Sequence, residues 1–188
     1  MKSHPAIVTV FGSSRPRSGD PHYAEAQALG AALAAQGFVV CSGGYGGVME
    51  AVSRGAKEAE GRTLAVTAKF FRARANQWVD EEIRVKTWQE RLFELIKRGR
   101  GYVACRGGTG TLVELAVVWE MLNKGAMARR PLVALGDFWQ PVIARVRETE
   151  LAHESRWSER RESMVYAASS AADAANYLAE RLVEKPRV

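Results

Sequence analysis

Short apolar runs alternate with longer helix-like segments along the chain, and glycine, proline or serine bounds most of the runs. Six of the runs predict β-strands, at residues 6–11, 38–41, 63–67, 101–105, 131–135 and 164–167. The segments between them predict helices, at residues 22–36, 48–60, 80–98, 138–149 and 170–184. A further helix is opened by the loop 106–111 and ends at Asn123.

The strand-like runs lack the alternation of apolar and polar residues that marks a sheet with one face in water. Continuous apolar strands are expected where helices cover both faces. The alternation of strand and helix favours a parallel sheet. We therefore expect an α/β fold, a doubly wound and mostly parallel Rossmann-like sheet with helices on both faces. The 188 residues show no linker or repeat, so residues 1–188 are expected to form a single domain.

Composition narrows the class of protein. Apolar residues make up 47% and charged residues 26%, which is typical of a folded, soluble chain. No run approaches the roughly eighteen apolar residues of a membrane span, and we recognise no signal peptide. A cytoplasmic protein without a membrane partner is expected. Two cysteines and three scattered histidines argue against a disulfide scaffold and a metal site. The net charge of +6 favours anionic ligands.

Glycine-bearing turns follow three of the predicted strands, at Gly12-Ser13, at 42–47 and at 106–111. Ligands of open α/β sheets bind beyond the carboxyl ends of the strands. Glycine lets the backbone approach closely, and a helix N-terminus favours an anion. These turns predict a phosphate site. The alternative is that the glycines only supply turn geometry. The P-loop motif is absent, and the dinucleotide fingerprint fails, which argues against ATP hydrolysis and against NAD or FAD.

Two charged residues lie at positions that suggest chemistry. Arg91 lies at the edge of the apolar stripe of the predicted helix 80–98, where a desolvated guanidinium needs an anionic partner. Glu114 follows the third glycine turn. Simpler roles stay open for both: Arg91 is placed for an ion pair with Glu94, and Thr111 with Glu114 matches a helix capping box.

The helix from Leu112 to Leu122 is apolar almost all round, which predicts burial in the core or against a second subunit. We therefore expect a homodimer. The segments 69–74 and 156–161 mix basic and aromatic residues, a pattern also seen at nucleic-acid surfaces. Acidic residues lie near both segments, so solvated surface is the preferred interpretation and no nucleic-acid partner is expected.

A family resemblance joins these motifs. The stretch 106–114 resembles the PGGxGTxxE motif of the LOG (Lonely Guy) family, and the turns 10–14 and 42–49 look like that family's. Arg91 is placed fifteen residues before that motif, as in the family's catalytic-arginine helix. Family members adopt a Rossmann-like fold and are commonly dimers. The best-studied members hydrolyse cytokinin riboside 5′-monophosphates, and some hydrolyse AMP, to free base and ribose 5-phosphate.

The resemblance implies that Arg91 and Glu114 are the catalytic pair and that no metal or organic cofactor is needed. It also implies a set of phosphate-binding residues from the three turns: Gly12, Ser13, Gly43, Gly44, Gly46, Gly107, Gly108, Thr109, Gly110 and Thr111. The expected substrate is a purine or cytokinin nucleoside 5′-monophosphate.

The chain departs from the family pattern at three positions. Arg106 replaces the family proline, Val113 replaces a common glutamate, and Leu92 replaces a basic residue. These departures keep a second hypothesis open, a non-catalytic binder or carrier of a phosphorylated ligand. Because a related group of the same superfamily resembles a molybdenum-cofactor carrier, that ligand is either a nucleotide or a molybdenum cofactor.

Overall fold

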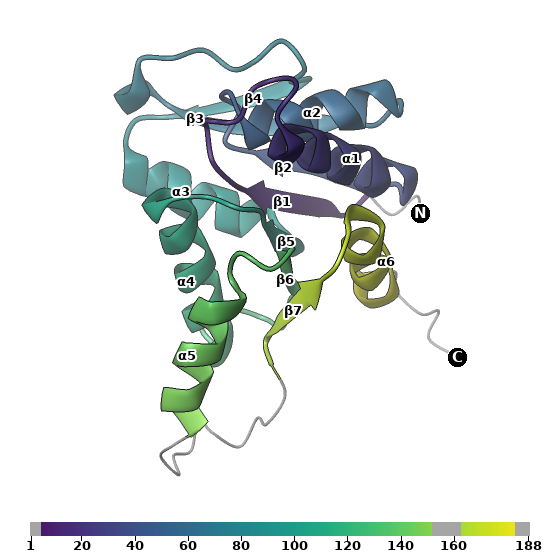
Figure 1. Ribbon diagram of the computed structural model, residues 1–188. Coiled ribbons are helices and arrows are strands. Elements are labelled where there is room, and N and C mark those ends of the chain that lie inside the picture. The colour runs from purple at the N-terminus through teal and green to yellow at the C-terminus, as the bar shows by residue number, and fades with distance from the viewer. Residues whose placement is uncertain (1–4, 152–162, 183–188) are drawn as a thin grey trace, which may run out of the picture.

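The computed structural model describes residues 5–151 and 163–182, and its strands form one seven-stranded sheet in the order β4-β3-β2-β1-β5-β6-β7 (Figure 1). All neighbouring pairs run parallel. The strands are β1 (Ile7–Phe11), β2 (Val39–Ser42), β3 (Thr63–Ala68), β4 (Glu81–Val85), β5 (Gly101–Ala104), β6 (Leu132–Leu135) and β7 (Val165–Ala168). The sheet confirms the expected α/β, Rossmann-like class.

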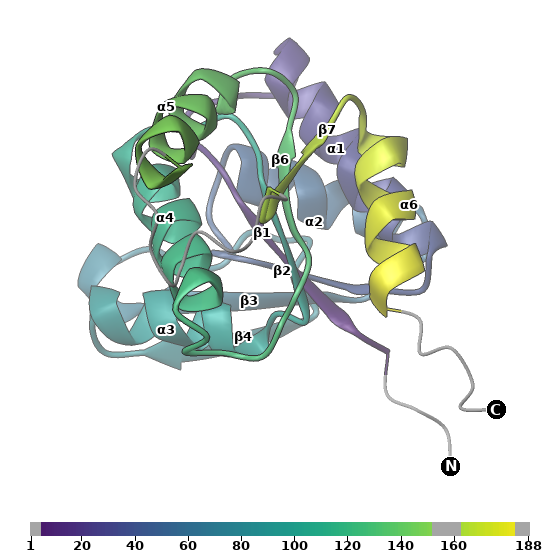
Figure 2. The same ribbon diagram turned by 90° about the horizontal axis from the view of Figure 1, so that it is seen from below.

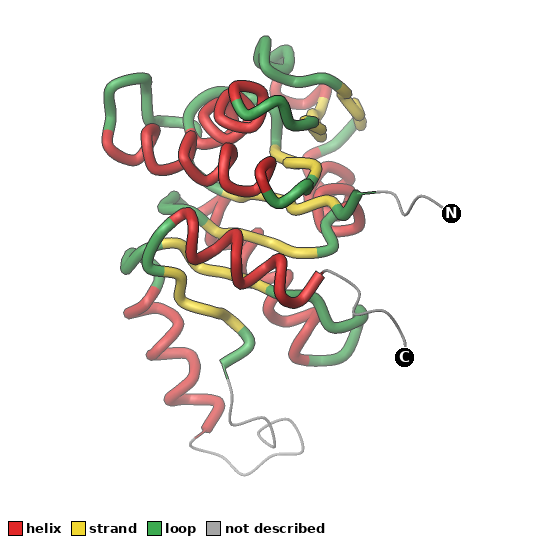
Figure 3. The backbone as a smooth tube through the Cα atoms, turned by 90° about the vertical axis from the view of Figure 1, so that its right-hand side faces the viewer, coloured by secondary structure: helices red, strands yellow, loops and turns green. Residues whose placement is uncertain are grey.

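Six α-helices cover the two faces of the sheet, and a short 3-10 helix, η1 (Lys69–Phe71), follows β3. Figures 2 and 3 show the strands as the central layer with helices on either side. The helices are α1 (Pro21–Ala35), α2 (Val48–Glu58), α3 (Trp88–Arg98), α4 (Thr109–Asn123), α5 (Gln140–Leu151) and α6 (Ala171–Leu182). Among the described residues, no helix is long and apolar enough to cross a membrane.

Two apolar cores follow from the alternation of side chains along the strands. Val8 and Val10 of β1 face the core beneath α1, α2 and α6. Phe11 joins the other core, beneath α3, α4 and α5, where its ring stacks on Tyr102 of β5. Because both faces are buried, the strands carry the continuous apolar runs that the sequence shows.

The central strand β1 pairs with β2 on one side and with β5 on the other. Strand order reverses direction at this point, which is where open α/β sheets bind ligands. Phe11, the last residue of β1, lies beside Ala104, the last residue of β5. The turns after β1, β2 and β5 therefore meet at one edge of the sheet.

One expected element is wrong. The sequence pattern predicts a single helix over 80–98. In the structure, residues 81–85 form the edge strand β4 and the helix starts only at Trp88. The start is fixed by a capping box, in which the Thr87 side chain accepts from the Glu90 N–H and Glu90 accepts from the Thr87 N–H. Ile83 therefore belongs to β4 and not to the apolar stripe of the helix.

Two other expectations extend beyond the described residues. The last helix is described to Leu182, so its expected end at Glu184 lies outside them, as does the basic segment 156–161. Side chains cap the start of that helix: the Asp173 N–H donates to Ser170 Oγ, and the Asp173 carboxylate accepts from the Ser169 N–H.

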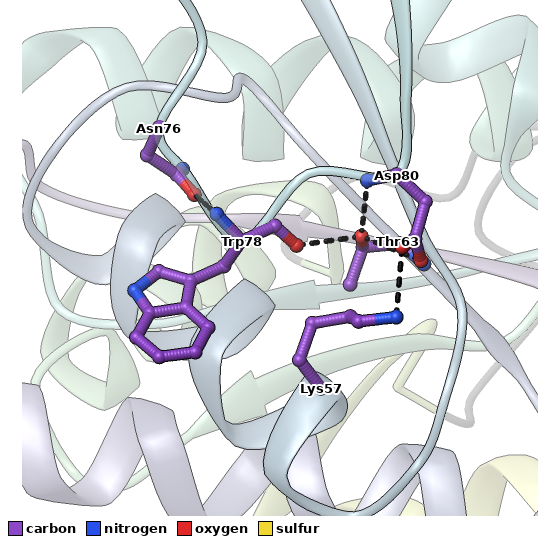
Figure 4. A network of polar contacts seen from close by, with 5 residues as sticks. All are labelled: Lys57, Thr63, Asn76, Trp78 and Asp80. Atoms are coloured by element: carbon purple, nitrogen blue, oxygen red, sulfur yellow. Dashed lines mark hydrogen bonds and ion pairs between the residues drawn. The ribbon is translucent and has the colours of Figure 1, made fainter.

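Asp80 fastens β4 to the start of β3 (Figure 4). Its carboxylate accepts from the Thr63 N–H at 2.9 Å, from Thr63 Oγ1 at 3.1 Å and from Lys57 Nζ at 2.7 Å. The single proton of the Thr63 hydroxyl is shared between the Asp80 carboxylate and the Trp78 carbonyl, and its oxygen accepts from the Asp80 N–H. These bonds hold the pKa of Asp80 below its usual value.

We expect Asp80→Ala to lower the melting temperature by about 2–10 °C, because the Thr63 N–H loses its acceptor and Lys57 loses its ion-pair partner. Glu81→Ala, an exposed neighbour on the same strand, is the control and should melt as the parent does. Because the folded-state pKa of Asp80 is depressed, its contribution is present above the unfolded pKa and is lost as the pH falls. Equal melting of the Asp80→Ala variant and the parent would show that the network does not stabilise the sheet.

Candidate functional site

Ser13 joins the three predicted turns. Its N–H donates to the Arg106 carbonyl at 3.3 Å, and its carbonyl accepts from the Val48 N–H at 2.8 Å. Its side-chain oxygen accepts from the Arg15 N–H. Gly12 before it lies against the Val48 side chain. The backbone of Ser13 is therefore used in the protein itself, and only its hydroxyl proton remains for a ligand.

The N-terminus of α4 is the most open part of the site. Gly108 is the N-cap, no side chain caps the helix, and the residues Gly108, Thr109 and Gly110 are exposed. The first N–H groups of a helix have no intrahelical partner, and with the helix dipole they bind anions. The capping-box alternative is wrong, because the helix starts at Thr109 and Thr111 is buried inside its first turn. Glu114 lies one turn further on.

The turn after β2 is largely buried. Gly43 and Gly44 are buried, and Gly46 is half-buried. The Gly44 carbonyl accepts from the Asn76 N–H at 2.7 Å and from Asn76 Nδ2 at 3.1 Å. Gly47, with φ 69°, caps α2. The turn is thus held by the protein's own groups, and Gly46 is its most open member of the predicted phosphate-binding set.

Arg91 of α3 is held beneath this edge with only 7% of its surface exposed. Its Nε donates to the Val66 carbonyl at 2.9 Å, and its Nη2 lies 3.7 Å from Met49 Sδ. Its guanidinium carbon lies 5.4 Å from the centroid of the Tyr45 ring and 5.5 Å from that of Phe71. These contacts fix the plane of the guanidinium but leave part of its charge without an anionic partner.

Gly43 is what allows this placement. A Cβ at position 43 would overlap the Nη2 atom of Arg91 and come within 2.6 Å of Met49 Sδ. Contacts under 3.0 Å force something to move, and here the obstructed group is a buried charge. Gly43 therefore makes room for the arginine, a role different from the phosphate contact expected of it.

Glu114 is the acidic partner of Arg91. Its Oε1 lies 3.9 Å from Arg91 Nη1, and its side chain is 15% exposed. Burial raises the pKa of Glu114 to about 7, and the positive charge of Arg91 opposes that rise. The alternative pairing of Arg91 with Glu94 is wrong, because Glu94 pairs with Arg98 at 2.7 Å. A carboxyl group poised near neutrality beside an anion site can stabilise a cation or accept a proton.

The aromatic rings beside the Arg91–Glu114 pair were not among the residues predicted for the site. Phe71 was placed in a basic segment and interpreted as solvated surface, yet its ring lies over Arg91. Asn76 was not predicted to have a role, yet its backbone and side chain hydrogen-bond to the glycine turn after β2. One sequence feature could have predicted these rings. Two phenylalanines, at 70–71, directly follow a buried strand that ends at the site.

Arg106 brings a charge to the mouth of the phosphate turn. It is exposed, and its guanidinium carbon lies 4.7 Å from the centroid of the Phe138 ring. The cation–π contact holds the side chain beside the N-terminus of α4. Arg106 thus adds a charged hydrogen-bond donor where the backbone already favours an anion.

We expect Arg106→Ala to weaken the binding of ribose 5-phosphate about tenfold, since an ionic hydrogen bond is lost. Isothermal titration calorimetry at two salt concentrations gives the measurement, and the variant should show the smaller salt dependence. Arg84→Ala, which removes an exposed arginine of β4, is the control. Unchanged affinity in Arg106→Ala would place this arginine outside the phosphate site.

Fold and site together define a Rossmann-like protein with an exposed helix N-terminus and an arginine–glutamate pair at the sheet's switch point. The chain belongs to the SLOG cluster4 family, whose model matches residues 5–171. It is 38% identical over 116 residues to a cytokinin riboside 5′-monophosphate phosphoribohydrolase of Mycobacterium marinum. It is 34% identical over 115 residues to the Mycobacterium tuberculosis protein of the same name. These matches cover 60% of the chain and 61% of each relative, and they confirm the LOG-type resemblance.

Solved structures show the same fold over nearly the whole chain. The molybdenum cofactor binding protein of Rippkaea orientalis has a TM-score of 0.76 at 24% identity, covering 96% of this chain and 99% of that one. The molybdenum cofactor carrier protein of Chlamydomonas reinhardtii has a TM-score of 0.67 at 22% identity, with coverages of 96% and 100%. At these identities the likeness establishes architecture alone.

Proposed function

We propose that the protein is a phosphoribohydrolase of the cytoplasm, which cleaves the N-glycosidic bond of a purine or cytokinin nucleoside 5′-monophosphate. The products are the free base and ribose 5-phosphate. The relatives of 34–38% identity carry the name of this activity, and the alignment with them spans 61% of their length.

One observation carries the proposal: Arg91 and Glu114 lie 3.9 Å apart, and Glu114 belongs to the second turn of α4, whose N-terminus is exposed. A 5′-phosphate bound at Gly108–Gly110 extends its ribose toward the pair. Phosphate binding supplies positioning energy remote from the bond that breaks. The pair then lies where charge develops in the reaction.

The reaction needs only water as co-reactant. The bond between C1′ and the base nitrogen breaks with its electrons on the base, and the ribose ring becomes positively charged. Ionised Glu114 stabilises that charge and accepts a proton from the water whose oxygen bonds to C1′. That proton ends on the departing base. Arg91 orients the carboxylate and contacts the sugar hydroxyls.

Chromatographic detection of free base tests the proposal. The parent protein is incubated with a panel of nucleoside 5′-monophosphates, including AMP and isopentenyladenosine monophosphate. Release of base together with ribose 5-phosphate is the expected result, and the preferred member identifies the base. A folded protein that releases no base from any member would contradict the activity.

A non-catalytic carrier of a phosphorylated ligand, a nucleotide or a molybdenum cofactor, is the second candidate. Arg106 favours it, because an exposed charge at the phosphate turn adds retention without adding chemistry. Mass spectrometry of the purified protein separates the two: an intact ligand that stays unhydrolysed for hours supports the carrier. Recovery of free base and ribose 5-phosphate excludes it.

A homodimer is also proposed, formed through the outer face of α4. Leu112 and Ala116 are exposed there, and Val113 and Val117 are only half-buried. Covering this apolar face removes it from water. Light scattering at micromolar concentration should give twice the 20.7 kDa chain mass, and Ala116→Glu should give the monomer. A monomeric parent would contradict the assembly.

A further inference from the structure

Three aromatic rings gather on one side of the Arg91–Glu114 pair. Phe70 and Phe71 come from η1 and Tyr45 from the turn after β2. Their centroids lie 5.2 Å apart for Phe70 and Phe71 and 5.5 Å apart for Tyr45 and Phe71. Phe70 is 67% exposed and Phe71 41% exposed, although exposing large apolar rings is costly. We call these three residues the aromatic shelf.

Hydrogen bonds fix the Tyr45 side of the aromatic shelf. Tyr45 Oη donates to the Ala68 carbonyl at 3.2 Å and accepts from the Ala68 N–H at 3.0 Å. The Tyr45 carbonyl accepts from Asn76 Nδ2 at 3.0 Å. The base of the shelf is therefore tied both to the end of β3 and to the segment that leads into β4. Tyr45, held in this way, loses little further freedom when a flat ligand binds beside it.

The order of groups along the site matches the order of parts in a nucleotide. The N-terminus of α4 takes the phosphate, and Glu114 follows one turn into the same helix. Arg91 Nη1 lies 3.9 Å from Glu114 Oε1, and the centroid of the Phe71 ring lies 5.5 Å from the Arg91 guanidinium carbon. In a nucleoside monophosphate the sequence is phosphate, ribose, base. The ring system of the base therefore falls on the aromatic side of the pair.

We propose that the aromatic shelf stacks the heteroaromatic base of the bound nucleotide and so governs which ligands the site accepts. This inference rests on the proposed function, because it takes the phosphate and ribose positions from it. Stacking on aromatic side chains tolerates many bases, since every base has a π-face. A flat purine lies on Phe70, whose ring is the most exposed, and Tyr45 with Phe71 supports it from the side of Arg91.

Calorimetry tests the shelf in the Glu114→Gln background, so that AMP is not consumed during titration. We expect Phe70→Ala and Phe71→Ala to weaken the binding of AMP about 5- to 100-fold. The affinity for ribose 5-phosphate should stay within about twofold of the parent's, because contacts to the phosphate persist. Phe70→Trp should retain the affinity for AMP. Val146→Ala, an exposed apolar truncation on α5, is the control and should change neither ligand.

Three outcomes would overturn the inference. Equal weakening of AMP and ribose 5-phosphate assigns the rings a structural role, and unchanged AMP affinity removes them from the site. A change of mass in light scattering with unchanged AMP affinity makes the shelf a protein contact. Selective loss of AMP affinity supports the shelf even where the parent releases no base, so the two proposals fail separately. A Glu114→Gln protein that binds no AMP contradicts the shelf as an AMP site, whereas the proposed function is decided by base release from the parent protein.

Discussion

Glu114→Gln is expected to lower the turnover of nucleoside monophosphates about 100- to 10,000-fold, the range for loss of an acid–base group. Glutamine has the same shape and keeps a hydrogen-bonding oxygen toward Arg91. It has no negative charge for the ribose cation and accepts no proton from water. Nucleotide binding should persist, since the N-terminus of α4 is untouched. Initial rates of base release and calorimetric affinity for AMP give the two measurements.

Glu120→Gln is the control for this variant. Glu120 is exposed on the same helix and forms an ion pair with Lys124. It should turn over at the parent's rate. A Glu114→Gln protein as fast as the parent would remove Glu114 from the chemistry and leave Arg91 without a catalytic partner.

The pH profile gives the same variant a second readout. The pKa of Glu114 is raised to about 7 by burial, and in the proposed mechanism the ionised form is the active one. The kcat/KM of the parent should therefore rise with pH and level off above about 7. For an acid whose folded-state pKa lies above its ordinary value, stability falls as the pH rises between the two. Glu114→Gln should remove that slope from the melting curve.

The sheet was predictable because its strands are buried on both faces, which gives continuous apolar runs between glycine-bearing turns. β4 was not, because it lies at the sheet's edge and is half-exposed, with Glu81 and Glu82 at its start. Only its short alternation and the Thr87–Glu90 capping box distinguished it from the helix that follows. An edge strand derives its place from the neighbour it pairs with, here β3.

The candidate site was predictable in its residues but only partly in their roles. Motif spacing identified Arg91 and Glu114, and the structure brings them together at 3.9 Å. Spacing says nothing about distance across the sheet, so the competing pairs with Glu94 and with Thr111 remained open until the fold decided between them. The role of Gly43 depends on a side chain 48 positions away, which no local pattern records.

Gly43→Ala is the second change with a large expected effect. Its Cβ overlaps the Nη2 atom of Arg91, and it sits close to Met49 Sδ as well. The guanidinium then shifts away from Glu114. A misplacement of about 1 Å can cost roughly 100-fold in rate, and overpacking costs about 1–3 kcal/mol of stability. We expect turnover of AMP to fall at least about 100-fold while the protein still folds.

A double-mutant cycle separates displacement of Arg91 from general damage to the turn. Gly43→Ala is compared in the parent and in an Arg91→Ala background, where the obstructed side chain is absent. If the alanine acts through Arg91, it costs turnover in the parent and adds almost nothing to Arg91→Ala, because contacting residues couple strongly. Additive losses would instead mean that Gly43 acts on the phosphate or on the turn itself. The cycle therefore decides whether this glycine serves the ligand, as its motif suggests, or the arginine beneath it.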